Sequence, residues 1–532
     1  MKLRITIVII ALAGVLAAPF ALKPQESLLG KADDLLVVIS PHNEAVRYEF
    51  TIAFMRHYRE LTGRSILIDW RLPGGTSEIS RYLDGEYLGA FERAWTNAGY
   101  KWSSEVAAAF NNPNIILPSS LHEDTQSQAA RRFFLESSVG IGIDVFFGGG
   151  TYDFKRLASA GCLVPSDILL NSSDWFQEGI IPWKVSGEEF YDKKARWIGA
   201  CLSSFGICYN MDTLRRLGFN RLPASWSDLG DPRLFKQVAL ADPSKSGSAA
   251  KAFEMVIQQQ MQNLVKETGR TDREVIAMGW AMGLRIIQSA SANARYFTDA
   301  ASKVPIDVSL GDAAIGMCID FYGRFQSEAV RLGDAPSRLQ YFTPVGGSSV
   351  GVDPIGLLRG ARNRDAAEMF IAFVLSPEGQ KLWNFKVGTP GGPQKYALRR
   401  LPVRKELYDP VFAEYRSDPT VQPYEDAKMF HYQDEWTSPL FRVIAFVVQV
   451  MCIDLHHEQV EAWQALVKKG FPPEAYRVFS NMEAVNYQAA SSRIKNTLSS
   501  RNRIKEVRLA KVLTEHFRRQ YRETVRLAHE DK

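Results

Sequence analysis

Three short segments rich in Gly, Ser and Thr have the composition of anion-binding turns, namely residues 73–77, 148–151 and 244–248. The first backbone N–H groups of a helix have no partner within that helix, and glycine lets a ligand approach the main chain closely. If each segment opens a helix, its N–H groups can bind a carboxylate, a phosphate or a carbonate. The alternative for each segment is simple N-capping by Thr76, Thr151 or Ser248. The anion hypothesis selects Gly75, Thr76, Ser77, Gly149, Gly150, Thr151, Ser246, Gly247 and Ser248.

A second set of residues has the chemistry of ligands for a hard cation. His42 and Glu78 stand near the carboxyl ends of predicted strands, and Tyr322 follows Asp320 at the end of another. Imidazole nitrogen and carboxylate or phenolate oxygen together suit Fe(III). The sequence therefore permits a metal site of His42, Glu78 and Tyr322. The structural alternative is that Tyr322 is a packed residue and that His42 caps the following helix.

No enzyme motif accompanies these residues. The chain contains no Walker A sequence, no G-x-G-x-x-G and no G-x-S-x-G, so neither a nucleotide-binding core nor a nucleophile elbow is indicated. The cysteines lack zinc spacing, and we interpret them as buried free thiols, with one disulfide as the alternative. These five residues are Cys162, Cys201, Cys208, Cys318 and Cys452. We therefore expect no enzyme activity and no cofactor.

The elements that must position these residues alternate in type. A strand beginning near Leu35 precedes a long amphipathic helix, a second strand and a further helix, and similar units recur at residues 141–161, 197–218 and 237–260. This alternation predicts a doubly wound α/β architecture with parallel sheets, in which ligand-binding turns gather at the carboxyl ends of the strands. An aromatic and Asn-rich segment at about 87–128 is predicted to be an insertion.

Both ends of the chain depart from this pattern. Residues 1–22 combine a basic start with an apolar run, which is typical of a signal peptide or, if uncleaved, of a membrane anchor. Residues 431–532 show helical periodicity, and from Arg493 onward twelve Lys and Arg residues stand against five Asp and Glu residues. A stripe with four-residue spacing should dock on the protein's own body, with a partner or a membrane surface as the alternatives. The stripe consists of Leu513, Phe517, Tyr521 and Val525.

The overall composition is that of a globular protein. The 532 residues are 46% hydrophobic and 23% charged, which argues against disorder and predicts two or three domains. The formal net charge of +5 is too small to indicate a nucleic-acid partner.

The order of several segments resembles a known family, the extracellular solute-binding proteins of ABC importers, in the group that contains ferric-binding and sugar-phosphate- or phosphonate-binding members. The resemblance spans about Leu35 to Tyr408 and rests on VVISPHNEA, GGTSEISRYL, DVFFGGGTYDFKRLASAGCLVP, WIGACLSSFGICYNMDTLRRLG, IGMCIDFYGR and GTPGGPQKYALRRLPVR. It implies a type II periplasmic-binding-protein-like fold with crossing hinge strands. Lobe 1 would comprise residues 34–202 and 352–430, lobe 2 residues 203–351, and a helical extension residues 431–532. Ser203, Ser204 and Asp320 complete the predicted ligand-binding set.

The resemblance also implies a function. The protein would bind a small anionic solute or ferric iron with a synergistic anion between its lobes, outside the cytoplasm, and deliver it to an ABC permease and its ATPase. The family's His and Glu ligands fall on His42 and Glu78, but its tyrosine pair falls on Phe321 and Tyr322, so one phenolate is missing. The anion turns are intact, and iron and an anionic solute stand as equal alternatives. A solute sensor for a signalling receptor and an exported phosphate-ester hydrolase are further alternatives.

Overall fold

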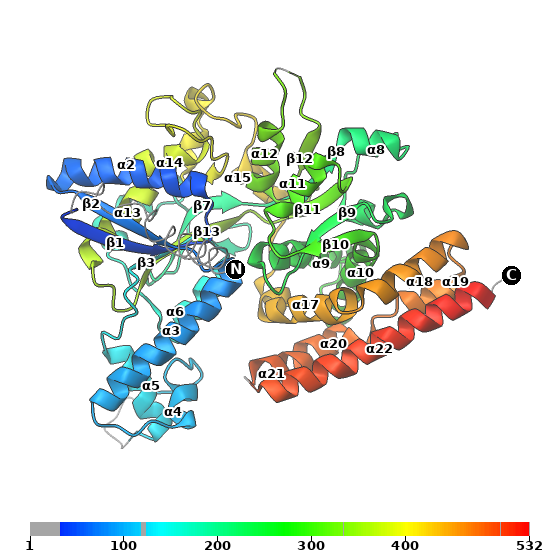
Figure 1. Ribbon diagram of the computed structural model, residues 1–532, viewed down its shortest axis with the longest axis horizontal. Coiled ribbons are helices and arrows are strands. Elements are labelled where there is room, and N and C mark those ends of the chain that lie inside the picture. Colours follow the sequence, from blue (N-terminus) through cyan, green and yellow to red (C-terminus); the bar gives the residue numbers. More distant parts are fainter. Residues whose placement is uncertain (1–31, 119–123, 334, 501, 531–532) are drawn as a thin grey trace, which may run out of the picture.

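The computed structural model describes residues 32–118, 124–333, 335–500 and 502–530. The predicted signal or anchor at residues 1–22 lies outside these described residues. The described chain forms two lobes, each built on one sheet, and a block of helices at its carboxyl end (Figure 1).

The first lobe is built on a seven-stranded sheet with the strand order β14-β7-β13-β3-β1-β2 and with β4 paired to β13. Helices α2, α13 and α14 lie together on one side of it, and α6 lies on the other (Figure 1). The strands are β1 (Asp34–Ile39), β2 (Ile66–Arg71), β3 (Val145–Phe147), β4 (Leu163–Val164), β7 (Ile198–Ser203), β13 (Gly351–Leu358) and β14 (Leu401–Pro402). The helices are α2 (Glu44–Thr62), α6 (Thr151–Ala160), α7 (Ile168–Asn171), α13 (Arg364–Leu375), α14 (Pro377–Asn384) and α15 (Pro423–Asp426). A small hairpin joins β5 (Lys184–Val185) to β6 (Glu188–Glu189).

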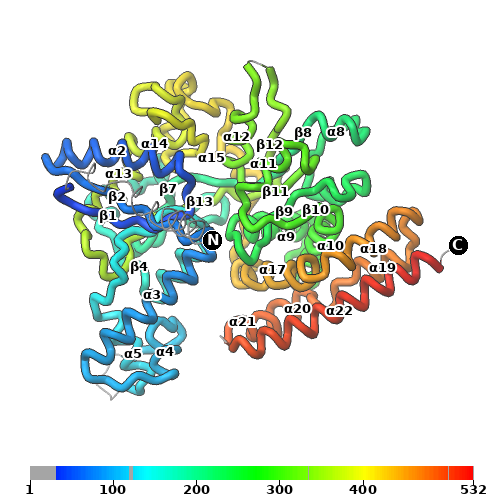
Figure 2. Tube along the Cα trace, in the orientation of Figure 1, coloured from blue at the N-terminus to red at the C-terminus, as the bar shows by residue number. Residues whose placement is uncertain are grey.

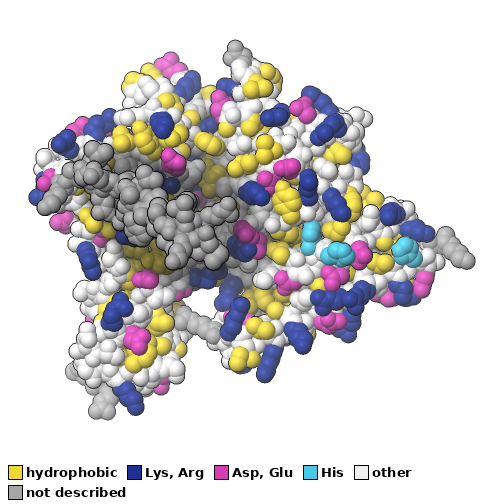
Figure 3. Space-filling view, in the orientation of Figure 1, with side chains coloured by type: hydrophobic (Ala, Val, Ile, Leu, Met, Phe, Trp, Pro, Cys, Tyr) yellow, Lys and Arg dark blue, Asp and Glu magenta, His cyan; other side chains and the backbone are white. Residues whose placement is uncertain are grey.

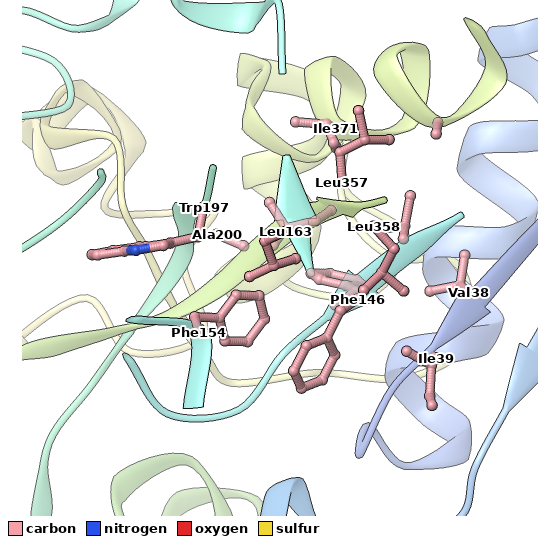
Figure 4. Close-up of a cluster of buried hydrophobic side chains, with 14 of the residues drawn as sticks. Val38, Ile39, Phe146, Phe154, Leu163, Trp197, Ala200, Leu357, Leu358 and Ile371 are labelled. Carbon is pink, nitrogen blue, oxygen red and sulfur yellow. The ribbon is translucent and has the colours of Figure 1, made fainter. Parts of the chain in front are cut away.

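Helix α2 shows how local sequence sets these elements. The Asn43 side chain accepts a hydrogen bond from the backbone N–H of Val46, so Asn43, and not His42, caps the helix. Gly63 ends it in the left-handed conformation with φ of 71°. Phe50 and Phe54, one turn apart, are fully buried. Each such side chain stabilises the fold by about 1.5–3 kcal/mol through burial of apolar surface. Figure 4 shows part of the same core, where Phe146, Phe154, Leu163 and Leu357 pack between sheet and helix.

The second lobe is built on a five-stranded sheet with the order β10-β9-β11-β8-β12. Its strands are β8 (Phe205–Asn210), β9 (Val238–Ala241), β10 (Ala294–Thr298), β11 (Ile315–Ile319) and β12 (Leu339–Phe342). Its helices are α8 (Met211–Arg216), α9 (Gly247–Thr268), α10 (Arg273–Ala292), α11 (Lys303–Leu310) and α12 (Asp320–Ala329).

The chain passes between the two sheets twice, and after α15 it crosses again to the second lobe. One residue, Ser204, separates β7 in the first sheet from β8 in the second, and residues 343–350 lead back from β12 to β13. The strands that follow the two passages, β8 and β13, are antiparallel to their neighbours. The prediction of parallel sheets is therefore wrong in this respect: both sheets are mixed, because each receives one strand that enters from the other lobe.

The segment at 87–128 forms part of a helical arm on the first lobe. Helix α3 (Thr76–Asn97) runs out from the sheet, and α4 (Ser104–Ala109) and α5 (Gln126–Glu136) pack at its outer end (Figure 1). The arm has an aromatic core in which Phe91 stacks on Phe110 at a ring-centroid distance of 4.6 Å. Burial of these rings explains why an Asn-rich segment still forms an ordered unit.

The helices after residue 433 pack on the second lobe, where α17 contacts α9 and α18 contacts α10 (Figure 2). They are α16 (Asp434–Thr437), α17 (Phe441–Val448), a π-helical turn (Gln449–Ile453), α18 (His456–Lys468), α19 (Pro473–Phe479), α20 (Tyr487–Ala489), a second π-helical turn (Ala490–Ile494), α21 (Lys495–Ser499) and α22 (Arg503–Glu530). Leu513, Phe517 and Tyr521 are at most 1% exposed, and Val525 packs against the same core. The predicted docking of this stripe on the protein's own body is confirmed.

One stretch of the described chain, Asp434–Ile453, is apolar and long enough to cross a membrane by length and composition. Half of its most apolar window is buried inside the protein. Val447 and Val448 are fully buried in the core shared with the second lobe. This environment is that of a core helix.

Candidate functional site

The three predicted anion turns each join a strand to a helix. They connect β2 to α3, β3 to α6 and β9 to α9. The capping alternative is wrong in its residues, because the N-caps are Gly75, Gly150 and Ser246. Ser246 accepts a hydrogen bond from the backbone N–H of Ala249 at 3.3 Å. The hydroxyl groups of Thr76 and Thr151 are therefore not needed to cap their helices.

These turns meet in space. A Cβ placed on Gly149 would lie 2.5 Å from Thr76 Cγ2, and one on Gly247 would lie 3.8 Å from Thr76 Cβ. A Cβ on Gly75 would lie 3.2 Å from the carbonyl oxygen of Lys245. Two of the turns belong to the first lobe and the third to the second lobe. The N-termini of α3, α6 and α9 therefore converge between the lobes, and each brings unpartnered N–H groups and the positive end of a helix dipole.

A cleft of 930 Å³ opens beside the turns: Ser77 of the first turn and Ser244 and Lys245 of the third line it, together with Tyr152 and Asp153 from the start of α6. One wall comes from the first lobe and its arm, and the other from the third turn and the carboxyl-terminal helices α17, α21 and α22. Figure 3 shows the molecule hollowed between the arm and these helices. The ionisable side chains of the lining are five basic and three acidic, which leaves an excess of two positive charges: Arg81, Arg156, Lys245, Arg442 and Arg503 against Asp84, Asp153 and Glu506. This balance favours an anionic ligand.

Asp153 is a carboxylate of the cleft lining whose pKa is shifted by its burial. It lies in the first turn of α6 and is 7% exposed. Burial raises its pKa to about 6, and the neighbouring Arg156 guanidinium opposes that rise only in part. At neutral pH the folded protein therefore keeps a carboxylate whose charged form is disfavoured by its surroundings.

Replacing Asp153 by asparagine should stabilise the protein at pH 7.5 by about 2–3 kcal/mol, because the pKa of the carboxyl is higher in the folded chain than in the unfolded chain. With a folded pKa of about 6 and a model value of 3.8, wild-type stability falls as pH rises through this interval. The advantage of Asp153→Asn should therefore vanish near pH 3.5. Urea unfolding at both pH values measures it, and an equal advantage at both would contradict this origin.

A second cluster surrounds the buried guanidinium of Arg400, which is 1% exposed. Arg400 pairs with Asp353, and its Nη1 lies 3.0 Å from Nε2 of His42. Burial and then the charge of Arg400 hold the pKa of His42 well below its usual value, so the imidazole is neutral and its Nε2 accepts the hydrogen bond. The guanidinium also lies 4.0 Å from the ring centroid of Phe321. His42 touches the second turn, since a Cβ on Gly148 would lie 2.5 Å from its ring.

The remaining predicted site residues have partners of their own. Glu78 accepts a hydrogen bond from the backbone N–H of Gly75 at 3.0 Å and so takes part in capping the N-terminus of α3. Asp320 pairs with Arg324 at 2.6 Å, and burial raises the pKa of Tyr322. Within the described ranges, no three His, Cys, Asp or Glu residues gather as a metal site. All five cysteines are free and buried, as the sequence predicts.

Ser203 and Ser204 lie at the first passage between the lobes. The Ser203 hydroxyl donates to Asp353 at 3.1 Å, and the Ser204 hydroxyl is 3.3 Å from that of Thr343. The second contact joins the two connecting segments, and the first joins β7 to β13 beside them. Both side chains therefore have a structural role at the hinge.

The lobes are also joined by a buried charge cluster that sequence patterns did not indicate. Lys251 on α9 pairs with Glu188 on β6 of the first lobe at 3.0 Å and with Glu254 at 2.9 Å. Its ammonium group lies 3.8 Å from the ring centroid of Tyr432. Burial lowers the pKa of Lys251, but the two carboxylates more than offset this, so its pKa lies well above the usual value. Lys251 is thus a charged link between the lobes.

Comparisons with known proteins agree with this architecture. Residues 142–414 match the family described as bacterial extracellular solute-binding protein. The periplasmic binding protein AfuA from Actinobacillus pleuropneumoniae, solved with exogenous fructose-6-phosphate bound, covers 80% of this chain and 100% of its own at 17% identity, with a TM-score of 0.50. At this identity the likeness shows the fold alone, which is the type II periplasmic-binding-protein fold with a helical carboxyl-terminal segment.

Two curated relatives share part of the sequence. An uncharacterized protein of Haemophilus influenzae is 27% identical over 241 residues, which are 45% of this chain and 60% of that protein. The phosphoglycerate transport regulatory protein PgtC of Salmonella typhimurium is 24% identical over 214 residues, 40% of this chain and 45% of that protein. The chain thus spans about half to three fifths of the length of these relatives.

Proposed function

The chain belongs to the bacterial extracellular solute-binding proteins, and from that premise we propose that it captures a small anionic solute between its lobes and delivers it to an ABC permease outside the cytoplasm. The observation that carries the proposal is the convergence of three helix N-termini at one end of the cleft. Backbone N–H groups and helix dipoles favour a phosphate or carboxylate there. The surplus of basic side chains in the lining acts in the same direction.

The contacts of the predicted iron ligands favour an anion over ferric iron. His42 Nε2 faces the Arg400 guanidinium, and Glu78 is engaged with the backbone of Gly75. A cation next to His42 would be repelled by the buried positive charge of Arg400. An anion at the neighbouring turns would instead be attracted by it.

The arrangement of the turns supports the proposal of solute capture. The N-termini of α3 and α6 move with the first lobe and that of α9 with the second, so an anion bound by all three is held by both lobes. Such a ligand binds the closed arrangement better than an open one and shifts the population toward it. The permease would then recognise the closed, loaded form.

The first test is a thermal-shift and calorimetric titration with inorganic phosphate, fructose 6-phosphate and ferric citrate. We expect stabilisation by the phosphate compounds, since a ligand of the folded state raises stability by RT ln(1 + [L]/Kd). Thr76→Val should weaken their affinity at least tenfold, because Thr76 lies against both Gly149 and Gly247. The matched control is Thr96→Val, the same change at the exposed far end of α3. Stabilisation by ferric citrate alone would overturn the proposal.

A second candidate function is solute sensing, which the name of the relative PgtC as a transport regulatory protein favours. The two functions share the cleft and differ in the membrane partner. Transport of labelled solute into proteoliposomes that contain the cognate permease, dependent on this protein, supports delivery. Binding without any effect on transport supports sensing.

A further inference from the structure

The cleft extends well beyond the three anion turns. Its far part, which we call the annex, lies between the arm of the first lobe and the carboxyl-terminal helices of the second. The arm contributes Leu88, Ala107 and Phe110, and the helices contribute Ala445, Phe446 and Val507. Both segments that interrupt or extend the α/β pattern in the sequence therefore build the same cavity.

The walls of the annex carry apolar side chains that are partly open to solvent, beside the ion pairs that Arg442 and Arg503 make with Glu506. Leu88 is 37% exposed and Val507 is 55% exposed, on opposite walls of one cavity. When an apolar group displaces the water between two apolar walls, the burial of apolar surface lowers the free energy of the complex. The turns, in contrast, offer N–H groups and positive charge. The two ends of the cleft thus have different chemistry.

The volume of the cleft also leaves room for more than an anionic group. Its 930 Å³ is near the upper end of the range for sites that hold drug-sized ligands. At the density of liquid water it has room for on the order of thirty non-hydrogen atoms. A phosphate or carboxylate group at the turns fills only a small part of this volume.

We propose that the solute is an amphiphilic anion, with its phosphate or carboxylate head at the three turns and an apolar acyl or aryl body in the annex. The inference rests on the proposed function, because the head uses the same turns, and it adds the substrate class. The helix N-termini at one end of the cleft fix which way the solute lies. Closure of the lobes brings the two walls of the annex together around the apolar body.

The test is a calorimetric titration of the full chain with inorganic phosphate, methyl phosphate, butyl phosphate, hexyl phosphate and hexanol. We expect affinity to rise roughly two- to fourfold for each methylene buried in the annex, so hexyl phosphate should bind at least tenfold more tightly than methyl phosphate. Hexanol should bind far more weakly than hexyl phosphate, because it lacks the anionic head.

Two variants test whether the alkyl chain of the ligand lies in the annex. Leu88→Gln and Val507→Thr should each remove several-fold affinity for hexyl phosphate and leave the affinity for inorganic phosphate unchanged. The matched controls are Leu61→Gln and Val512→Thr, which alter exposed residues outside the cleft lining. An affinity that does not grow with chain length, or that grows but is unaffected by the annex variants, overturns the inference and leaves the proposed function intact. If no phosphate compound binds at all, the proposed function fails and the inference with it.

Discussion

Replacing Arg400 by methionine is expected to lower the free energy of unfolding by about 3–5 kcal/mol, because it leaves the buried carboxylate of Asp353 without its guanidinium partner. The change also removes the hydrogen bond to His42. Urea unfolding at pH 7.5 measures the loss.

The control for this variant is Arg362→Met, which removes an exposed arginine and should change stability by less than about 0.5 kcal/mol. The double variant Arg400→Met, Asp353→Leu should recover part of the loss, since it removes the uncompensated charge as well. A loss below 1 kcal/mol in the single variant would show that water or a rearranged side chain satisfies Asp353.

Gly149→Ala is expected to reduce anion affinity at least tenfold. Gly149 has φ of 118°, a conformation that disfavours L-residues, and its new Cβ would lie 2.5 Å from Thr76 Cγ2. The strain should also cost about 1–3 kcal/mol of stability. Calorimetric titration with fructose 6-phosphate and urea unfolding measure the two effects.

The adjacent glycine provides the matched control. Gly150 has φ of −88°, and a Cβ there would meet nothing within 4 Å. Gly150→Ala should therefore keep its affinity within about twofold and lose at most about 1 kcal/mol as an N-cap. Equal losses of affinity in the two variants would mean that the turn binds through flexibility at both positions and not through the close approach of Gly149 to Thr76.

Much of the frame of this protein was predictable because local patterns determine it. The three strand–turn–helix units follow from a buried apolar run, a glycine-rich turn and a helical period, all of which lie within about 25 residues. The stripe that begins at Leu513 required only a four-residue spacing. In both cases the residues that interact through the backbone, or that share one helix face, are close in sequence.

The cluster around Arg400 and the charged link formed by Lys251 were not predictable in this way. Arg400 contacts partners 47 and 358 residues away, and Lys251 pairs with Glu188 across the two lobes. Nothing in the neighbouring sequence distinguishes these cations from the 62 other Lys and Arg residues of the chain. The antiparallel direction of β8 and β13 was missed for a related reason, because strand direction depends on how the chain crosses between sheets.

The two walls of the annex belong to opposite lobes: the arm is continuous with the first lobe, whereas α17 and α22 pack on the second. A change in the angle between the two lobes would therefore change the width of the annex. The stacked rings of Tyr152 and Phe441, with centroids 4.6 Å apart, form one of the contacts between these two bodies. On the proposed function, a rigid body seated in the annex would act as a spacer, and the angle at which the lobes come to rest would report the thickness of the solute to a partner that contacts both lobes.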